Sequence, residues 1–429
     1  MFDKRTIAAS LRTEAAKREF HLLYGGTERT AAEQADRYEA LLTTYAEHFG
    51  CEGEAPAFFS SPGRTEIVGN HTDHNNGLVL AAAVTLDTLA AAAPTGDGII
   101  TLYSQGYDKP FVVDTRDLEK KEAEKNTTDA LIRGVCRKLH DMGYAIGGFN
   151  AAVTSCVLSG SGLSSSAAFE VLLVCILDGL YNGSILDGVT RAKISQWVEN
   201  NYFGKPSGLM DQSACSIGGL VGIDFKYADP KIGAYSFDFA ARGFSLVVLA
   251  TNSSHDDLTD EYAAIPREMR AVAEALGGKV LRDVKVEQLL ERLPEVRQKT
   301  SDRAVLRALH YYDENERVRA MYTALENGDL DAFLDNVIRS GESSWKLLQN
   351  LYVGGSTEQS LALACALSER MLRGSGAWRV HGGGFAGTIL AFVPHYKLAS
   401  YVEKMNAVFG AGACTVLDIR PVGAKKVEL

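Results

Sequence analysis

The stretch that decides the fold is FNAAVTSCVLSGSGLSSSAAFEVLLVCILDGLY, from Phe149 to Tyr181. Its beginning, Phe149 to Leu158, is strand-like, and the long apolar run at its end is typical of a buried helix. Between them lies a segment of small and hydroxyl-bearing residues, Ser159 to Ala168. The sequence therefore predicts a strand, a tight loop and a helix in immediate succession.

This loop has the chemistry of a phosphate cradle. Small residues let the backbone approach an anion closely, and the helix that follows offers unpaired N–H groups at its positive end. Serine hydroxyls can reach phosphate or Mg²⁺. The loop lacks the Gly-Lys-Ser/Thr of a Walker motif, and its spacing differs from GxGxxG. The alternative interpretation is a flexible turn that caps a core helix.

Composition limits what surrounds this loop. The 429 residues are 46% apolar and 23% charged, which favours two or three domains with substantial cores. The formal net charge of −10 argues against a general nucleic-acid binder. No uninterrupted apolar run suits a membrane span, and the N-terminus lacks a secretory block. The seven cysteines are scattered without CxxC spacing, so we expect reduced thiols and a cytoplasmic protein.

The rest of the chain alternates helical and strand-like texture. Periodicity predicts two helices within residues 1–50, separated by Gly25-Gly26, and a long helical region from Glu261 to about Arg373. Strands are predicted where β-branched and aromatic residues gather, at 57–84, 99–104, 111–114, LVGIDF, SLVVLAT and TILAFVP. A helix is expected at 128–142, and a helix and a strand close the chain.

A second polar segment runs from Ser61 to Gly77 and reads SPGRTEIVGNHTDHNNG. Its donors and acceptors suit vicinal hydroxyls. A metal site is the weaker interpretation, because His71 and His74 lie three apart without a helical signal and no third ligand can be placed. A solvated loop is the other alternative.

Two further segments carry candidate chemistry. Asp211 lies in an uncharged, glycine-flanked stretch, GLMDQ, where a buried carboxylate needs a partner. It either caps a helix or acts as a base. The glycines of His381 to Gly387, HGGGFAG, permit close packing against a ligand or another loop.

In this order the four segments resemble the galactokinase family of the GHMP kinases. The family signature GRxNxIGEHTDYNxGxVL is similar to Gly63–Leu80, and GxGLSSSAS is similar to Gly160–Ala168. GxMDQ and TGGGFGG are similar to Gly208–Gln212 and His381–Gly387. The resemblance implies an α+β, two-lobed fold: an N-terminal mixed-sheet lobe with the phosphate loop, and a C-terminal ferredoxin-like lobe. We expect an N-terminal helical extension at 1–34 and the two lobes at 35–225 and 226–429.

The resemblance implies transfer of the ATP γ-phosphate to the anomeric hydroxyl of galactose or a close relative. It assigns catalytic roles to Arg64 and Asp211. It also implies that Ser165 or Ser166, together with Glu199, binds Mg²⁺. The sugar-binding roles fall on Asn70, His71, Asp73, His74, Gly208 and Tyr262. The ATP-binding roles fall on Gly160, Ser161, Gly162, Leu163, Ser164, Ser165, Ser166 and Ala167. The expected partners are sugar and ATP, without nucleic acid or membrane, in a monomer or weak homodimer.

Departures from the family pattern leave two alternatives open. Asn70 stands where the family pattern has glutamate, and His74 stands where it has tyrosine. Both changes would accommodate a carboxylate on the sixth carbon of the sugar, so a galacturonate kinase is one alternative. Glu66 stands where the family pattern has asparagine, and we hypothesise that it forms an ion pair with Arg64. A catalytically silent sugar and ATP sensor is the other alternative, disfavoured by retention of Arg64, Glu199 and Asp211.

Overall fold

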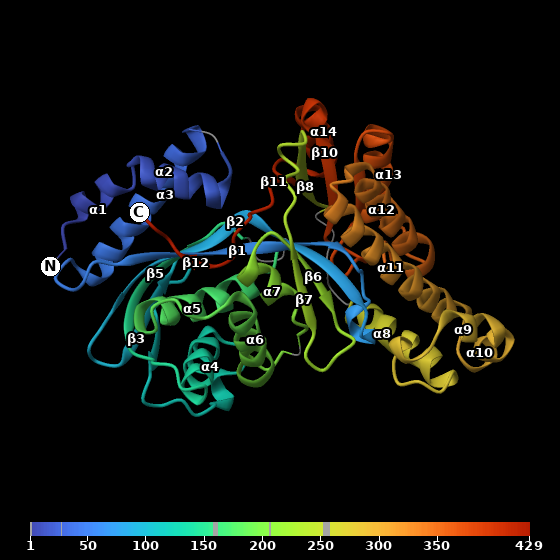
Figure 1. Cartoon of the computed structure of the whole chain (residues 1–429), viewed down its shortest axis with the longest axis horizontal. Coiled ribbons are helices and arrows are strands. Elements are labelled where there is room, and N and C mark those ends of the chain that lie inside the picture. The colour runs from blue at the N-terminus through green and yellow to red at the C-terminus, as the bar shows by residue number, and fades with distance from the viewer. Residues whose placement is uncertain (1, 27, 158–161, 206, 252–257) are drawn as a thin grey trace.

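The computed structural model describes residues 2–26, 28–157, 162–205, 207–251 and 258–429. They form two β-sheets, each covered by helices (Figure 1). Within these ranges, no helix combines the length and the apolar character needed to cross a bilayer.

The larger sheet has eight strands in the order β12-β1-β2-β5-β3-β4, with β6 on β2 and β7 on β6. One half of β2 pairs with β5 and the other half with β6. Only β3 and β5 run parallel, so the sheet is mixed, as expected. Its strands are β1 (Ala57–Val68), β2 (Leu78–Pro94), β3 (Ile99–Ser104), β4 (Phe111–Asp114), β5 (Phe149–Ser155), β6 (Leu220–Asp224), β7 (Lys231–Tyr235) and β12 (Lys425–Lys426).

Helices lie on both faces of this sheet, the N-terminal three on one side and α4 to α7 on the other (Figure 1). Helix α5 is hydrophobic almost all round and is correspondingly buried. The helices are α1 (Lys4–Ser10), α2 (Glu14–Tyr24), α3 (Glu28–Phe49), α4 (Thr128–Asp141), α5 (Ser165–Tyr181), α6 (Gly188–Val198) and α7 (Met210–Ile217).

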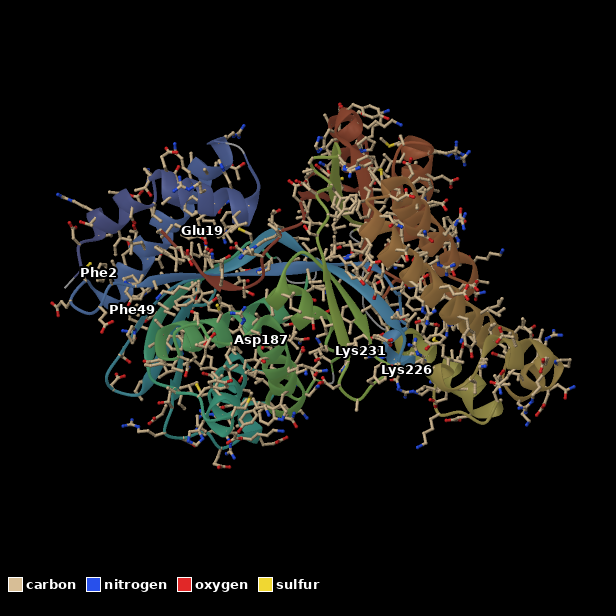
Figure 2. All side chains as sticks on the ribbon, viewed as in Figure 1. Phe2, Glu19, Phe49, Asp187, Lys226 and Lys231 are labelled. Atoms are coloured by element: carbon tan, nitrogen blue, oxygen red, sulfur yellow. The ribbon has the colours of Figure 1, made fainter. Side chains whose placement is uncertain are left out.

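A buried ionic cluster fastens the N-terminal helices to the sheet. Asp87, in β2, is fully buried and accepts from Arg37 of α3 at 2.6 Å and from the Tyr24 hydroxyl of α2 at 2.6 Å. Arg420 lies 3.6 Å from the same carboxylate. Burial raises the pKa of Asp87, but Arg37 and Arg420 outweigh it, so the pKa lies below its ordinary value. Figure 2 locates Glu19 of α2 on the side that faces the sheet.

The smaller sheet has the strand order β11-β8-β10-β9 and is antiparallel throughout. Along the chain its elements run strand, helices, strand, strand, helix, strand, which is the ferredoxin-like arrangement expected from the sequence. Its strands are β8 (Phe244–Ala250), β9 (Ala377–His381), β10 (Thr388–Pro394) and β11 (Cys414–Leu417). Its helices are α8 (Thr259–Ala275), α9 (Val286–Glu291), α10 (Leu293–Lys299), α11 (Asp302–Asn327), α12 (Leu330–Ser343), α13 (Ser360–Leu372) and α14 (His395–Phe409).

The predicted strands and most predicted helices are confirmed, and the break at Gly25 is observed as the end of α2. The prediction of two helices within residues 1–50 is wrong, because the first of them is divided at residues 11–13 into α1 and α2. The sequence did not reveal β7, β9 or β12, because strands this short carry little periodicity. The expected boundary at residue 34 lies inside α3, and residue 225 lies between β6 and β7. The division into lobes remains a proposal.

Candidate active site

The described part of the phosphate loop lies directly against β1. Arg64 donates its backbone N–H to Leu163 O at 3.0 Å, and a Cβ on Gly63 would lie 3.0 Å from the same oxygen. Helix α5 begins just after Ser164, a residue in the left-handed conformation with φ +56°. Gly160 and Ser161 lie outside the described residues.

The first turn of α5 leaves its hydroxyls available. Ser165 is half-buried and Ser166 is exposed, whereas Ala167 packs into the core. The N-terminal backbone N–H groups of this helix have no partner within the helix, which is the local requirement for binding an anion. Of the predicted phosphate-binding residues, Gly162, Ser164, Ser165 and Ser166 are therefore accessible at a helix N-terminus, whereas Leu163 and Ala167 are buried.

Arg64 and Asp211 form a two-pronged ion pair. Arg64 Nε lies 2.7 Å from Asp211 Oδ1, and Arg64 Nη2 lies 2.8 Å from Asp211 Oδ2. The third guanidinium nitrogen donates to Gly162 O, and the Ser164 hydroxyl donates to Asp211. These contacts bring together β1, the phosphate loop and the first turn of α7.

Electrostatics keep this pair ionised. Burial raises the pKa of Asp211, but Arg64 and the Ser164 hydroxyl outweigh it, so the pKa lies below its ordinary value. Burial lowers the pKa of Arg64, but Asp211 outweighs it and the pKa is raised. Such a carboxylate orients a hydroxyl well but is a weak proton acceptor.

The loop after β1 brings Asp73 to the same site. Asp73 begins a short 3₁₀ helix, and a Cβ on Gly208 would lie 3.4 Å from Asp73 Oδ2. Gly208 belongs to the segment that leads to Asp211, so these predicted sugar-binding residues converge. His74 Nε2 lies 3.8 Å from Asp73 Oδ1, with its ring half exposed.

His71 is held against the glycine run of the C-terminal lobe. Its backbone is left-handed, with φ +59°, and its Nε2 lies 2.8 Å from Gly383 O. Burial lowers the pKa of His71 to about 4, so the ring is neutral near pH 7. The Tyr262 hydroxyl donates to Gly384 O at 2.8 Å, and its ring packs on Gly383.

Asn70 is committed to the protein itself. Its Nδ2 donates to Glu66 Oε1 at 3.0 Å and to Gly382 O at 2.6 Å, which uses both donors of the amide. Its Oδ1 accepts from Asn350 at 2.8 Å. The predicted sugar-binding residue Asn70 is thus 1% exposed, with its side chain in the contact between the lobes.

The hypothesis that Glu66 pairs with Arg64 is wrong. Glu66 Oε1 lies 3.0 Å from Arg379 Nη2, in β9, while Arg64 pairs with Asp211. Sequence spacing placed Glu66 and Arg64 on one face of β1, but it could not show that β9 supplies a buried arginine there. Burial raises the pKa of Glu66, more strongly than Arg379 and Arg64 lower it.

His381, at the end of β9, is a buried hydrogen-bonding residue. Its Nε2 lies 3.0 Å from Thr65 Oγ1, and its Nδ1 lies 2.9 Å from Thr388 Oγ1. Burial lowers its pKa to about 3, so the ring is neutral. A Cβ on Gly162 would lie 2.9 Å from His381 Nδ1, so the glycine run supports the phosphate loop from the C-terminal lobe.

Sequence reasoning gave no role to Gln212, which holds Glu199, or to Glu170, which Gln212 also contacts. Gln212, beside Asp211, donates to Glu199 Oε2 at 2.7 Å and to Glu170 Oε2 at 3.2 Å. Burial, followed by the Glu199 charge, raises the pKa of Glu170 well above its ordinary value. The i, i+4 spacing of Ser166 and Glu170 on one helix face could have suggested Glu170.

The donor set around Glu199 fits Mg²⁺. Magnesium takes oxygen ligands and uses only one or two carboxylates beside phosphate and water. Glu170 Oε1 and Gln212 Oε1 are buried without a hydrogen-bond partner, so oxygen acceptors are concentrated around Glu199. Within the described ranges, no group of three or more His, Cys, Asp or Glu could hold a metal by itself.

Comparison with known families matches two parts of the chain. The model described as "Galactokinase galactose-binding signature" matches residues 43–94, and "GHMP kinases N terminal domain" matches residues 130–219. The first range covers β1, β2 and the loop with Asp73, and the second covers α5, Glu199 and Asp211.

Whole-chain relatives point the same way. A galactokinase of Streptomyces coelicolor is 32% identical, covering 87% of this chain and 94% of its own. The human galactokinase is 31% identical, covering 89% of this chain and 94% of its own. Lactococcus lactis galactokinase, solved in complex with galactose, aligns with a TM-score of 0.75 at 23% identity, over 90% of this chain and 98% of that one. Methanococcus jannaschii mevalonate kinase aligns at a TM-score of 0.62 and 14% identity, over 86% and 99%.

Proposed function

The chain belongs to the galactokinase family of the GHMP kinases, and on that premise we propose that it transfers the ATP γ-phosphate to the anomeric hydroxyl of galactose. The observation that carries this proposal is the Arg64–Asp211 pair, which touches the phosphate loop through Gly162 and Ser164. The Arg64–Asp211 pair thus contacts the phosphate loop and belongs, through Asp211, to the segment whose Gly208 lies beside Asp73.

The residues divide the work of phosphoryl transfer. Asp211 orients the anomeric hydroxyl and accepts its hydrogen bond, while Arg64 neutralises charge on the equatorial oxygens of the transferred group. Asp73 accepts hydrogen bonds from sugar hydroxyls, with Gly208 leaving room for the ring. The first turn of α5 binds the ATP phosphates.

Ser165 or Ser166 and Glu199 would hold Mg²⁺, which when bound neutralises charge on the β- and γ-phosphates. Gln212 fixes the Glu199 carboxylate that would hold this ion. The same proposal places the enzyme in the cytoplasm, because all seven cysteines are free thiols.

Galactose is favoured over galacturonate because both Asn70 donors are already engaged by Glu66 and Gly382. A carboxylate on the sixth carbon would therefore receive no hydrogen bond from this amide. The Asp211, Arg64 and Glu199 side chains also favour an active enzyme over a silent sensor.

The test is an ADP-release assay with galactose, galacturonate, arabinose, N-acetylgalactosamine and glucose. We expect the highest kcat/KM for galactose and phosphate attached at the anomeric oxygen. A higher kcat/KM for galacturonate would overturn the choice of substrate. Binding of galactose and ATP without turnover would overturn the catalytic assignment and leave the sensor.

A further inference from the structure

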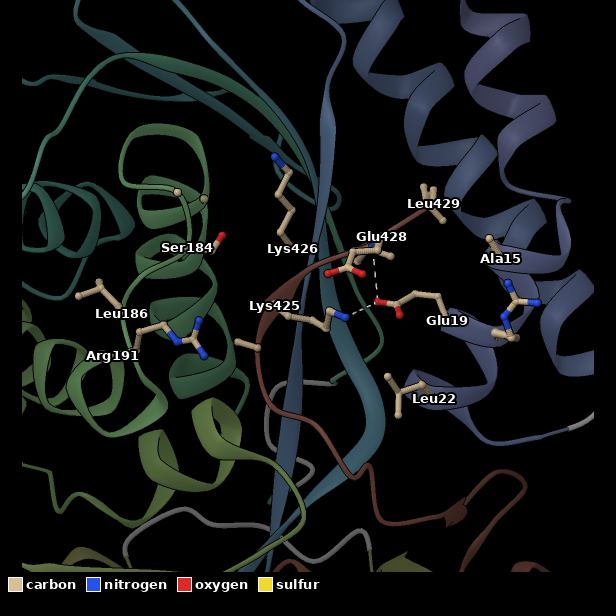
Figure 3. Close-up of a pocket in the computed structure, with 15 residues that line it drawn as sticks. Ala15, Glu19, Leu22, Ser184, Leu186, Arg191, Lys425, Lys426, Glu428 and Leu429 are labelled. Atoms are coloured by element: carbon tan, nitrogen blue, oxygen red, sulfur yellow. Dashed lines mark hydrogen bonds and ion pairs between the residues drawn. The ribbon is translucent and has the colours of Figure 1, made fainter.

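A large cavity lies away from the catalytic residues, at the seam between the N-terminal helices and the end of the chain. It has a volume of about 1050 Å³. Helix α2 forms one wall, the turn after α5 and the start of α6 form another, and residues 424–429 cross between them (Figure 3). Three segments far apart in the sequence therefore build it.

Basic side chains outnumber acidic side chains in the lining. Arg18, Arg191, Lys425 and Lys426 face two carboxylates, Glu19 and Glu428. Figure 3 shows Lys425 at the centre, bound to Glu19, with Arg191 reaching in from the opposite side. Because Lys425 Nζ lies 2.7 Å from Glu19 Oε1, that pair neutralises itself. In a chain of net charge −10, the cavity retains a local positive excess.

Among the described residues, three of the cations make no direct contact with an acidic side chain, although Asp178 and Asp187 lie within electrostatic range of Arg191. In the part of the chain that the structure describes, no side-chain hydrogen bond or ion pair engages Arg18, Arg191 or Lys426. Arg191 Nε is moreover buried without any hydrogen-bond partner. Arg191 as a whole is half-buried and lines the cavity, so an anionic ligand there would give the accessible part of its guanidinium a charge-assisted hydrogen-bond partner.

We propose that this cavity binds a small phosphate monoester, such as a sugar phosphate. A phosphate dianion matches the positive excess, and Arg and Lys are the usual phosphate partners in proteins. The volume is at the upper end of the range for small-molecule sites, so it has room for a sugar body beside the phosphate. Leu22, Leu186 and Gly183 offer that body an uncharged surface.

The proposal gives the N-terminal extension a role. Arg18 and Glu19 belong to α2, which precedes the part of the sequence that resembles the kinase family. Docking of α2 through Tyr24 and Asp87 places Arg18 opposite Arg191 of α6. Without that helix the cavity would have an open side.

The test is isothermal titration calorimetry of the full chain with glucose 6-phosphate, inorganic phosphate and glucose. We expect one saturable site for glucose 6-phosphate, weaker binding of inorganic phosphate and none of glucose. Absence of saturable binding would overturn the proposal. Equal affinity for inorganic phosphate would overturn the assignment of an ester, because the sugar body would then contribute nothing.

Variants locate the site. Arg191→Gln is expected to raise the Kd for glucose 6-phosphate at least tenfold. Lys193→Gln, on the same helix but paired with Asp229, is the matched control and should leave the Kd unchanged. Arg64→Gln should also leave it unchanged, and loss of binding in that variant would place the ligand in the catalytic site and overturn the proposal.

Lys426→Gln keeps the proposal falsifiable if the Arg191 variant does not fold. Lys426 is exposed, so this change should leave thermal unfolding unaltered while raising the Kd several-fold. Unchanged affinity in Lys426→Gln and in a folded Arg191→Gln would overturn the proposal. An equal loss of affinity in Lys193→Gln would also overturn the proposal, because binding would then reflect only the overall electrostatic attraction of this surface for anions.

Discussion

Asn70 donates a hydrogen bond to Glu66 across 3.0 Å, and the two residues stand where the family pattern has glutamate and asparagine respectively. The carboxylate and the amide have exchanged places. The exchange places the charge on β1, 3.0 Å from the buried Arg379. Two departures that look independent in the sequence are therefore one structural change.

This relationship predicts strong coupling between Glu66→Asn and Asn70→Glu. The first change leaves the buried Arg379 without its carboxylate, at a cost of about 3–5 kcal/mol. The second brings two carboxylates together. The double variant should be more stable than the sum of the single effects by at least ~1 kcal/mol. Denaturant unfolding of all four proteins measures this, and additivity would contradict it.

Asp211→Asn should lower kcat by roughly 10²- to 10⁴-fold, because the amide no longer supplies the negative charge that orients the sugar hydroxyl. Steady-state ADP release measures the effect. Asp114→Asn, at an exposed ion pair with Arg116, serves as the matched control and should retain full activity. A kcat within a factor of two of the parent would remove Asp211 from the mechanism.

Gln212→Ala should raise the Mg²⁺ concentration needed for half-maximal activity about 10- to 100-fold, because Glu199 loses the amide that fixes it. The KM for sugar should change little. Glu199→Gln should show a larger effect of the same kind. If Gln212→Ala changed only the KM for sugar, the proposal that Gln212 positions the Mg²⁺ ligand Glu199 would fail.

The raised pKa of Glu170 predicts a stability that depends on pH. The folded protein holds this proton more tightly than the unfolded chain, so the stabilisation is complete below the ordinary glutamate pKa. It is lost as pH rises through the folded pKa.

Glu170→Gln should accordingly flatten the decline in unfolding free energy as the pH rises above the ordinary glutamate pKa. Denaturant unfolding at several pH values tests this. Glu358→Gln, at an exposed position, should follow the parent curve. Parallel curves for the parent and Glu170→Gln would contradict the assignment.

Asp87→Asn should destabilise the protein by about 3–5 kcal/mol, since Arg37 and Arg420 would remain as buried charges without their shared carboxylate. The N-terminal helices should become the preferred site of limited proteolysis. Asp97→Asn, near the surface between β2 and β3, should leave the digestion pattern unchanged. An unaltered pattern in Asp87→Asn would show that α2 and α3 dock by apolar packing alone.

Local patterns predicted much of the fold. The strand, glycine and serine loop and buried helix from Phe149 to Tyr181 could be recognised because periodicity and small residues act over neighbouring positions. The long α5 is an example, since its apolar character persists around the whole helix. Short strands escaped: β9 has only five residues, too few for a clear period, and β12 pairs with β1, which lies hundreds of residues away.

The sequence by itself determined the family, the order of the motifs and the residue types available for catalysis. Only the tertiary structure decided which charge pairs with which. Glu66 is two residues from Arg64 yet pairs with Arg379, and Gln212 is bound to Glu199 and Glu170 rather than to its neighbour Asp211. Ion pairs and hydrogen bonds depend on distances of a few ångströms, which are set here by the packing of β1 against β9 and of α7 against α5 and α6.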